Sequence, residues 1–434
     1  MVIESFESDL WADVKVCALG AHDISMRPGA LFTSERYYNG GGMGDKKIIY
    51  EGKDIILYMD NISSSKVVFA FTGYEGEPGK NLYGDGFIQK CGFSGVFFVS
   101  LQNHWWQTPE LIEAINIANS HTKNHEVRVS YGQSMGGYGA LLCARRLNSR
   151  AVVTAPQTTI NPELASIGDI WLENIRRSPI VRDNIREELV GMQSAIVIYD
   201  NKGGSDVSHV NYIEGRDGVV LYKIPYATHN LPATLSEMGL LSRVIAGFFE
   251  SENKFSEFHF RRMIRERRAN SFSYLKRLGF FAQRSKSKWL YDYYKKCVVA
   301  RILEKISEAG LPCIGCVSAA EFRVNSHVES FDESTGVFIS KGNDPQVMFK
   351  NIPENSTSGT LVFYSSSSSG GNLFYSRGTE ERFSAADSMS FRVVAGVNVV
   401  QFDVRHEERG GAKALRFDPM SREGFFSVLS VSYN

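Results

Sequence analysis

The feature that most constrains this sequence is a strand-like apolar run that passes, through a glycine-rich turn, directly into a helix-like run. Gly132, Ser134 and Gly136 form the pattern Gly-x-Ser-x-Gly at this turn. A serine at the apex of a sharp strand-to-helix turn has strained backbone angles, and side chains two residues away on either side would collide. The helix behind it supplies positive potential and a free N–H. A glycine-rich turn that only packs a helix on a sheet explains the glycines but not the serine, so we predict that Ser134 is a nucleophile.

Short apolar runs alternate with helix-like stretches between residues 50 and 250. The runs lie at 67–71, 95–100, 127–130, 151–154, 195–199 and 219–222. Continuous rather than alternating apolar residues are typical of strands buried on both faces. The stretches between them are long enough for right-handed crossovers. The pattern predicts a doubly wound, mostly parallel α/β sheet, with additional, mostly β structure contributed by the first 60 residues.

The 434 residues exceed the roughly 250–300 at which a single hydrophobic core stops growing, so we expect more than one domain. We place the α/β domain at 1–250 and a helical connector rich in Arg and Lys at 251–317. From 318 to 434, short strands are separated by Gly, Ser and Asn turns, and these strands predict a β-sandwich of the jelly-roll type. The serine run at 365–369 indicates an exposed flexible loop within it.

Composition excludes several classes of protein. Lys plus Arg equals Asp plus Glu, at 48 each, so the charge balance does not call for nucleic acid as a partner. Six cysteines in so long a chain are not a disulfide framework. The first residues lack the pattern of a signal peptide, and no stretch reaches the roughly 18 apolar residues of a membrane span. We therefore expect a soluble, reduced, cytoplasmic protein.

A serine nucleophile needs a base and an acid, which follow it in the order acid, then histidine. His229 lies directly after the last strand-like run, where the base is expected, whereas His209 lies nearer the acid loop and could be structural. Two aspartates follow the run at 195–199. Asp200 abuts the strand end, where an aspartate often caps backbone N–H groups. Asp206 lies further along and is better placed to reach a neighbouring loop, so we favour Asp206 and keep Asp200 as the alternative.

The oxyanion of a tetrahedral intermediate needs two N–H donors. We predict the N–H of Met135, directly after the nucleophile, and that of Tyr74, which follows Gly73 in the loop after the run at 67–71. Another segment on the same rim carries His104, Trp105 and Trp106. These three either shape the substrate pocket or simply pack, and the sequence does not separate the two possibilities.

The residues 131–140 and 155–157, with Asp206, His209 and His229, resemble a group of bacterial α/β-hydrolases found beside glycan-assembly proteins. The resemblance spans about residues 60–250 and implies Ser134, Asp206 and His229 as a catalytic triad. It does not fix the substrate, because this fold serves esterases, peptidases, thioesterases and acyltransferases alike.

The residues 414–419 and the final strand resemble jelly-roll accessory domains of bacterial glycosyltransferases and other glycan enzymes. This second resemblance implies proximity to carbohydrate. Tyr364, Phe374 and Tyr375 are candidates for stacking on sugars, although core packing is expected for at least half of them.

These observations lead to one principal hypothesis and three alternatives. We expect a serine carboxylic-ester hydrolase that removes acetyl-type acyl groups from a carbohydrate or small ester, with no metal or organic cofactor. The alternatives are an acyltransferase, a peptidase, and a non-catalytic module in glycan synthesis or export. A homo-oligomer is possible. Cys313 and Cys316 are expected to be ordinary cysteines, and the arginines at 261, 262, 265, 267 and 268 a solvated helix face, with docking to an acidic glycan or membrane surface as the alternative.

Overall fold

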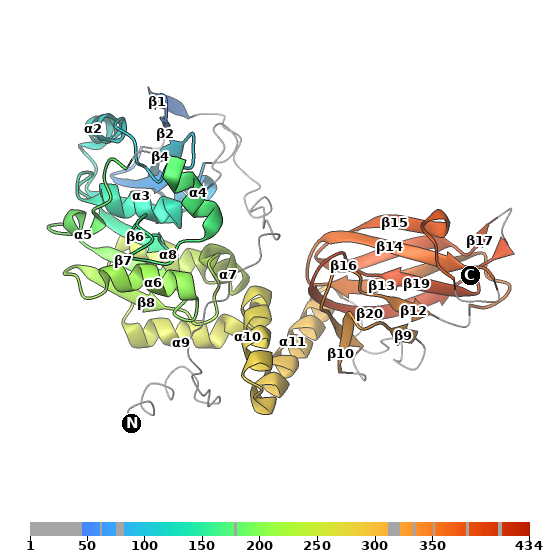
Figure 1. Ribbon diagram of the computed structural model, residues 1–434. Coiled ribbons are helices and arrows are strands. Elements are labelled where there is room, and N and C mark those ends of the chain that lie inside the picture. The colour runs from blue at the N-terminus through green and yellow to red at the C-terminus, as the bar shows by residue number, and fades with distance from the viewer. Residues whose placement is uncertain are drawn as a thin grey trace. The chain divides into compact units, whose positions relative to one another are not determined.

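The structure is a computed structural model that describes residues 46–60, 63–74, 82–177, 180–310, 322–332, 336–349, 352–378, 382–406 and 410–434. The chain divides into two compact units between Arg277 and Leu278 (Figure 1). The predicted boundary at residue 317, Cys313 and Cys316 lie outside the described residues, as do the first 45.

The first unit is built on an eight-stranded sheet. Its strands are β1 (Lys47–Glu51), β2 (Ile55–Met59), β3 (Lys66–Phe71), β4 (Ser94–Ser100), β5 (Val127–Gln133), β6 (Arg150–Thr154), β7 (Ala195–Tyr199) and β8 (Val219–Lys223). Their order across the sheet is β1-β2-β4-β3-β5-β6-β7-β8. All six predicted runs form strands, and the parallel sheet is confirmed.

Only β2 runs against the other strands. β1 pairs with β2, and β2 with β4, in antiparallel fashion, whereas every pair from β4 to β8 is parallel. β3 lies between β4 and β5. The chain therefore passes from β3 to β4 on one side and later places β5 on the other side of β3. Such a switch point leaves a crevice at the carboxyl ends of the central strands, where ligands bind in open α/β sheets.

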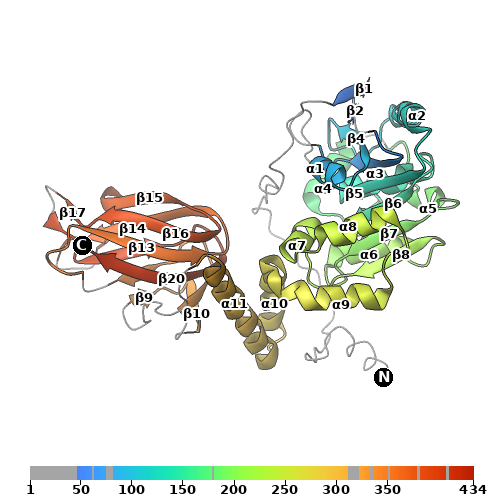
Figure 2. The same cartoon turned by 180° about the vertical axis from the view of Figure 1, so that it is seen from behind.

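Helices cover both faces of the sheet. The first unit contains α1 (Asp85–Lys90), α2 (Leu111–Thr122), α3 (Met135–Ala144), α4 (Asp169–Arg177), α5 (Ile185–Glu188), α6 (Gly204–Ile213), α7 (Leu231–Glu237), α8 (Leu241–Glu250) and α9 (Glu257–Arg267). Side chains of α2, α3, α5 and α6 join one buried cluster with alternate residues of the strands. On the other face, seen in Figure 2, Phe249 of α8 packs against Phe87 of α1 and Tyr131 of β5. Burial on both faces explains the continuous apolar runs of central strands such as β3 and β7.

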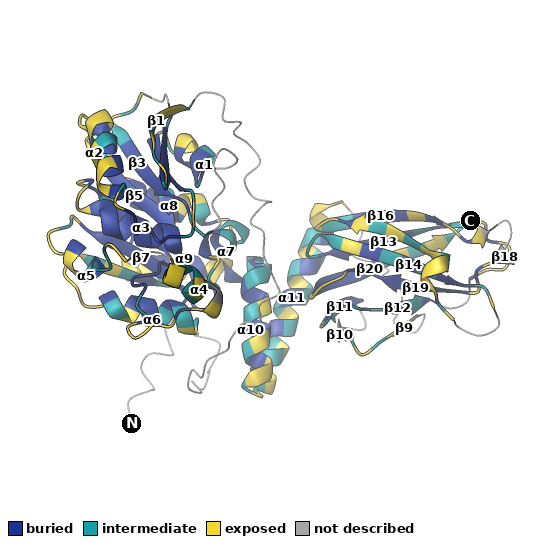
Figure 3. Cartoon of the chain, turned by 45° about the horizontal axis from the view of Figure 1, so that its top comes forward, coloured by how far each residue is buried: buried dark blue, intermediate teal, exposed yellow. Residues whose placement is uncertain are grey.

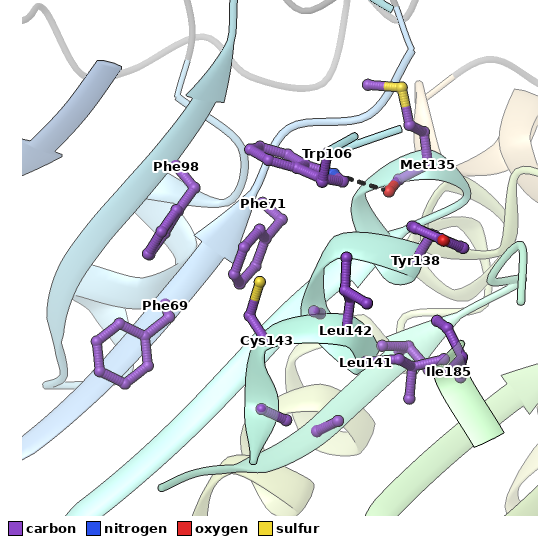
Figure 4. Close-up of a cluster of buried hydrophobic side chains, with 14 of the residues drawn as sticks. Phe69, Phe71, Phe98, Trp106, Met135, Tyr138, Leu141, Leu142, Cys143 and Ile185 are labelled. Carbon is purple, nitrogen blue, oxygen red and sulfur yellow. Dashed lines mark hydrogen bonds between the residues drawn. The ribbon is translucent and has the colours of Figure 1, made fainter. Parts of the chain in front are cut away.

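The most deeply packed helix is α3, all of whose residues are buried (Figure 3). Glycines allow this close approach. A Cβ on Gly136 would lie 2.3 Å from the carbonyl oxygen of Phe71, and a Cβ on Gly139 would lie 2.4 Å from the indole nitrogen of Trp106. Figure 4 shows Trp106 lying over the start of α3, where its Nε1–H donates to the carbonyl oxygen of Met135 (3.0 Å).

The described part of the expected helical connector at 251–317 is mainly helical. It contains α9, α10 (Phe272–Arg284) and α11 (Lys288–Glu308), and the division between the two units falls inside α10. On α9 the predicted basic face is largely paired, since Arg261 and Arg262 form ion pairs with Glu257 and Glu266. Arg268 is instead buried, with its guanidinium over the ring of Tyr274.

The second unit contains two five-stranded antiparallel sheets. One has the order β10-β11-β20-β13-β16 and the other β15-β14-β19-β12-β9. The first comprises β10 (Val328–Asp332), β11 (Val337–Ser340), β13 (Ser358–Ser365), β16 (Gly396–Asp403) and β20 (Gly424–Tyr433). The second comprises β9 (Phe322–Val324), β12 (Val347–Phe349), β14 (Ser369–Ser376), β15 (Ser388–Val393) and β19 (Ala414–Asp418), and a separate small ribbon pairs β17 (Arg405–His406) with β18 (Gly410–Gly411). Phe363 of one sheet meets Phe417 of the other with ring centroids 4.8 Å apart, in a core shared by both sheets. The second unit is therefore a β-sandwich.

The serine run is not the exposed flexible loop that its composition suggested. Ser365 ends β13, Ser369 begins β14, and the turn between them carries the chain from one sheet to the other. The side chains order this turn, because Ser365 Oγ donates to the carbonyl of Ser367 and Ser366 Oγ accepts from the N–H of Phe425. Serine favours such local hydrogen bonds to backbone.

We expect Phe417→Ala to lower the free energy of unfolding of the second unit by about 3–5 kcal/mol, because Phe417 is fully buried between the sheets and its removal leaves a cavity. Val399→Ala is the matched control, since Val399 on β16 is 63% exposed and its truncation should cost less than about 0.5 kcal/mol. Urea unfolding followed by circular dichroism measures both. Equal losses in the two variants would contradict the shared core.

Candidate active site

The predicted site residues come from the carboxyl ends of neighbouring parallel strands. Tyr74 follows β3, His104 and the two tryptophans follow β4, and Ser134 follows β5. Asp200 and Asp206 follow β7, and His229 follows β8. Because these ends share one edge of the sheet, side chains far apart in the sequence gather there.

Ser134 lies at the apex of the turn between β5 and α3, with φ 53° and ψ −120°. A Cβ on Gly132 would lie 2.2 Å from the carbonyl oxygen of Gly136, so both glycines are required for so tight a turn. Backbone hydrogen bonds fix the serine in place: its N–H donates to the carbonyl of Thr154 (3.2 Å), and its carbonyl accepts from the N–H of Gln157 (3.2 Å). The geometry is that of a nucleophile elbow.

The two expected oxyanion donors flank this turn. Met135 is the first residue of α3, and the first N–H groups of a helix have no acceptor within it. The loop after β3 is adjacent, because a Cβ on Gly73 would lie 3.7 Å from the carbonyl oxygen of Gln133. The next residue, Tyr74, is half-buried, and its hydroxyl accepts from Nδ2 of Asn174 on α4 (2.9 Å).

The structure brings His229 and Asp206 together. Nδ1 of His229 is 2.7 Å from Oδ1 of Asp206, and Gln133, directly before the serine, donates through Nε2 to the carbonyl of His229 (2.9 Å). Nε2 of His229 is shielded from solvent and has no hydrogen-bond partner among the described residues. Burial lowers the pKa of His229, but the charge of Asp206 and the hydrogen bond to it outweigh burial, so the pKa is raised above its ordinary value.

Asp200 does not contact His229 but holds the loop that carries it. Its carboxylate accepts from the N–H groups of Tyr226 (2.9 Å), Thr228 (3.0 Å) and Lys202 (2.8 Å). Tyr226 and Thr228 both have positive φ, 61° and 65°, a conformation that needs outside support in residues of this kind. Asp200 is fully buried, and burial raises its pKa to about 6 despite the three N–H donors.

His104, Trp105 and Trp106 are buried, with 5%, 1% and 1% of their surface exposed. The ring of His104 contacts the carbonyl of Asp54 and accepts from the N–H of Trp106, and burial lowers its pKa. Trp105 donates through Nε1 to Oε1 of Gln157. The three side chains therefore brace the loop against the nucleophile turn, and a role in the substrate pocket stays a prediction.

Two residues of α4 that sequence reasoning missed lie at the site. The ring of Trp171 is 5.7 Å from that of His229 and half-buried, and Asn174 bonds Tyr74. No motif marked either residue. α4 lies in the segment between β6 and β7. The only available indication of these two residues was that a helix is inserted in this segment, which follows the strand next to the predicted nucleophile.

Within the ranges that the structure describes, no cluster of three His, Cys, Asp or Glu side chains is arranged to hold a metal ion. None of the helices described there is both long and apolar enough to cross a membrane.

No family model and no curated protein matches this sequence. Solved structures do match in fold. A capsule O-acetyltransferase of Neisseria meningitidis serogroup A is 11% identical with TM-score 0.35, covering 46% of this chain and 94% of that one. The Pyrococcus furiosus esterase Pf2001 is 16% identical with TM-score 0.34, covering 45% and 86%. A hormone-sensitive lipase from a metagenome library is 12% identical with TM-score 0.39, covering 50% and 86%. At these identities and TM-scores the likeness carries no argument about activity, which depends on the geometry of this chain's own residues.

The buried carboxyl of Asp200 should make stability depend on pH. Its pKa is about 6 in the folded chain and about 3.9 when unfolded, so its contribution to stability is fully present below about pH 4 and is lost as the pH rises through 6. We expect the stability of the native protein relative to Asp200→Asn to fall by roughly 2–3 kcal/mol between pH 3 and pH 7.

Urea unfolding at a series of pH values measures this difference. Asp217→Asn, at an exposed carboxylate, controls for the change in net charge. A flat difference between native protein and Asp200→Asn would show that Asp200 titrates normally, and a difference that rises with pH would show that its pKa is lowered in the folded protein.

Proposed function

We propose that the first unit is a serine carboxylic-ester hydrolase or acyltransferase with Ser134 as nucleophile, His229 as base and Asp206 as acid. The observation that carries the proposal is the 2.7 Å contact between Asp206 and Nδ1 of His229, which leaves Nε2 buried without a partner among the described residues. The serine in its strained turn is linked to this loop through its neighbour Gln133, which bonds the carbonyl of His229. To activate a serine, a histidine needs one ring nitrogen oriented by an acid and the other free to accept the proton of the serine.

The reaction follows from these positions. Nε2 of His229 removes the proton from Ser134 Oγ as the oxygen attacks the ester carbonyl, and the negative charge moves to the carbonyl oxygen. The N–H groups of Met135 and Tyr74 stabilise this oxyanion. The imidazolium returns its proton to the leaving alcohol as the ester bond breaks, which leaves an acyl-serine.

The acyl-serine is resolved by the same steps in reverse order. Water, or a sugar hydroxyl in a transferase, gives its proton to His229 and attacks the acyl carbon. The raised pKa of His229 supports both halves, because the imidazolium forms transiently in each and Asp206 stabilises it.

Carbohydrate as the alcohol part of the ester is supported by Trp171. Its half-buried ring lies 5.7 Å from the imidazole of His229, whose side chain is 32% exposed. The apolar face of a sugar ring can stack on such an indole. For the second unit, a jelly-roll topology with a sugar-binding role stays a prediction. Tyr364 and Tyr375 are buried there, and the guanidinium of Arg416 lies over Phe374, so none of the three offers a free stacking face.

A fluorophosphonate probe should label the native protein at Ser134, because only a serine deprotonated by a neighbouring base attacks phosphorus. Ser134→Ala should lose the label entirely, as read by mass spectrometry of the modified peptide. Ser120→Ala, at an exposed serine on α2, is the control and should label like the native protein. A folded native protein that does not label would favour the non-catalytic module instead, and ester and peptide substrate panels separate an esterase from a peptidase.

Trp171→Ala should raise KM for an acetylated oligosaccharide about 5–10-fold, the loss of roughly 1 kcal/mol of stacking, and leave KM for p-nitrophenyl acetate within about twofold. Trp289→Ala, at a partly exposed tryptophan of the second unit, is the matched control for the loss of an indole. Equal effects of Trp171→Ala on both substrates would indicate that the indole stabilises the structure of the site and does not contact the sugar.

A further inference from the structure

The base and acid of the proposed site lie next to a second buried histidine that the reaction does not use. His209 follows Asp206 by three residues on α6, and residues at this spacing lie on the same face of a helix. His209 is 1% exposed and Asp206 is 5% exposed. Asp206 and His229 are also the two charges that act on the pKa of His209, so the three side chains form one buried group.

The proton of His209 is located by its contacts. Nδ1 accepts from the backbone N–H of Thr158 (3.2 Å), so in the neutral ring the proton is on Nε2. Burial lowers the pKa of His209 to about 4, so the ring is neutral at physiological pH. Nε2–H is thus a fixed, uncharged donor.

Besides Nε2 of His229, two buried polar atoms of this group have no hydrogen-bond partner among the described residues. One is Nε2 of His209, a donor, and the other is Oδ2 of Asp206, an acceptor. Burying either alone costs free energy comparable to a lost hydrogen bond. Since the two atoms do not bond each other directly, one water between them would satisfy both the donor and the acceptor.

We propose that His209 is a positioning residue, whose Nε2–H holds the second carboxylate oxygen of Asp206 through one bridging water so that the first oxygen faces His229. This inference rests on the proposed triad. It also gives a role to Thr158. Gln157 donates to the carbonyl of Ser134 and the next N–H, that of Thr158, donates to His209. Through His209, the acid is therefore fixed relative to the nucleophile turn itself.

Two substitutions distinguish the roles of the two ring nitrogens of His209. His209→Gln places an amide N–H near the former Nε2 and keeps a donor toward Asp206. His209→Asn reaches only the former Nδ1 and keeps an acceptor for Thr158. In His209→Asn, Asp206 is free to rotate away, so the pKa of His229 should fall toward the ordinary value of about 6.5. In His209→Gln it should stay close to native.

The pKa of His229 is measured by NMR titration, which needs no turnover. In the same variants, kcat for ester hydrolysis should fall roughly 10-fold in His209→Asn with KM unchanged, well short of the roughly 10⁴-fold lost when a triad acid is replaced. Ser208→Ala is the control, because Ser208 lies on α6 and its Oγ bonds only toward Ser205 and Ser166. It should leave the pKa of His229 unchanged.

An unchanged or raised pKa of His229 in His209→Asn overturns the proposal, and so does an equal fall in both variants. The native protein gives an independent test in case the variants do not fold. The ¹⁵N shifts of His209 should show a neutral ring protonated at Nε2 at pH 7, and any other state overturns the proposal. Failure of Ser134 to label with fluorophosphonate refutes the triad's activity but leaves these NMR results to decide the role of His209.

Discussion

At Ser134 the chain leaves β5 and enters α3 within one residue, in a backbone conformation that costs about 1–3 kcal/mol. Such strain persists only where the surroundings hold it. Gly136 lets α3 approach the end of β3 to a distance that no side chain permits, and the indole of Trp106 holds the carbonyl of Met135 at the first turn (Figure 4). The close packing of α3, which organises the whole core of the first unit, is thus also what presents the serine and the N–H behind it.

The position of His229 depends on two aspartates with different roles. Asp200 holds backbone N–H groups and so fixes a loop with two residues of positive φ, whereas Asp206 contacts the imidazole of His229 that the loop presents. The two roles differ because the hydrogen bonds of Asp200 go to backbone N–H groups, whereas Oδ1 of Asp206 contacts the imidazole.

The sequence predicted the parts of this arrangement that depend on local pattern. Six apolar runs marked the strands, and the glycines around Ser134 marked the turn, because burial and steric conflict act on neighbouring residues. The choice between two aspartates needed loop geometry that spacing does not contain. Trp171 could not be found, since its significance comes only from the path of α4 to His229. The prediction of a flexible loop from the serine run at 365–369 was wrong for the same reason, because Ser366 accepts a hydrogen bond from Phe425, about 60 residues away.

The burial of the site is uneven, and this bears on its chemistry. Asp206 is almost fully enclosed, which strengthens its interaction with the imidazole because little water screens it. The side chain of His229 is 32% exposed, yet its Nε2 is shielded. In the proposed reaction, proton transfer takes place at an atom protected from solvent, where the charge of Asp206 acts on the imidazolium with little screening by water.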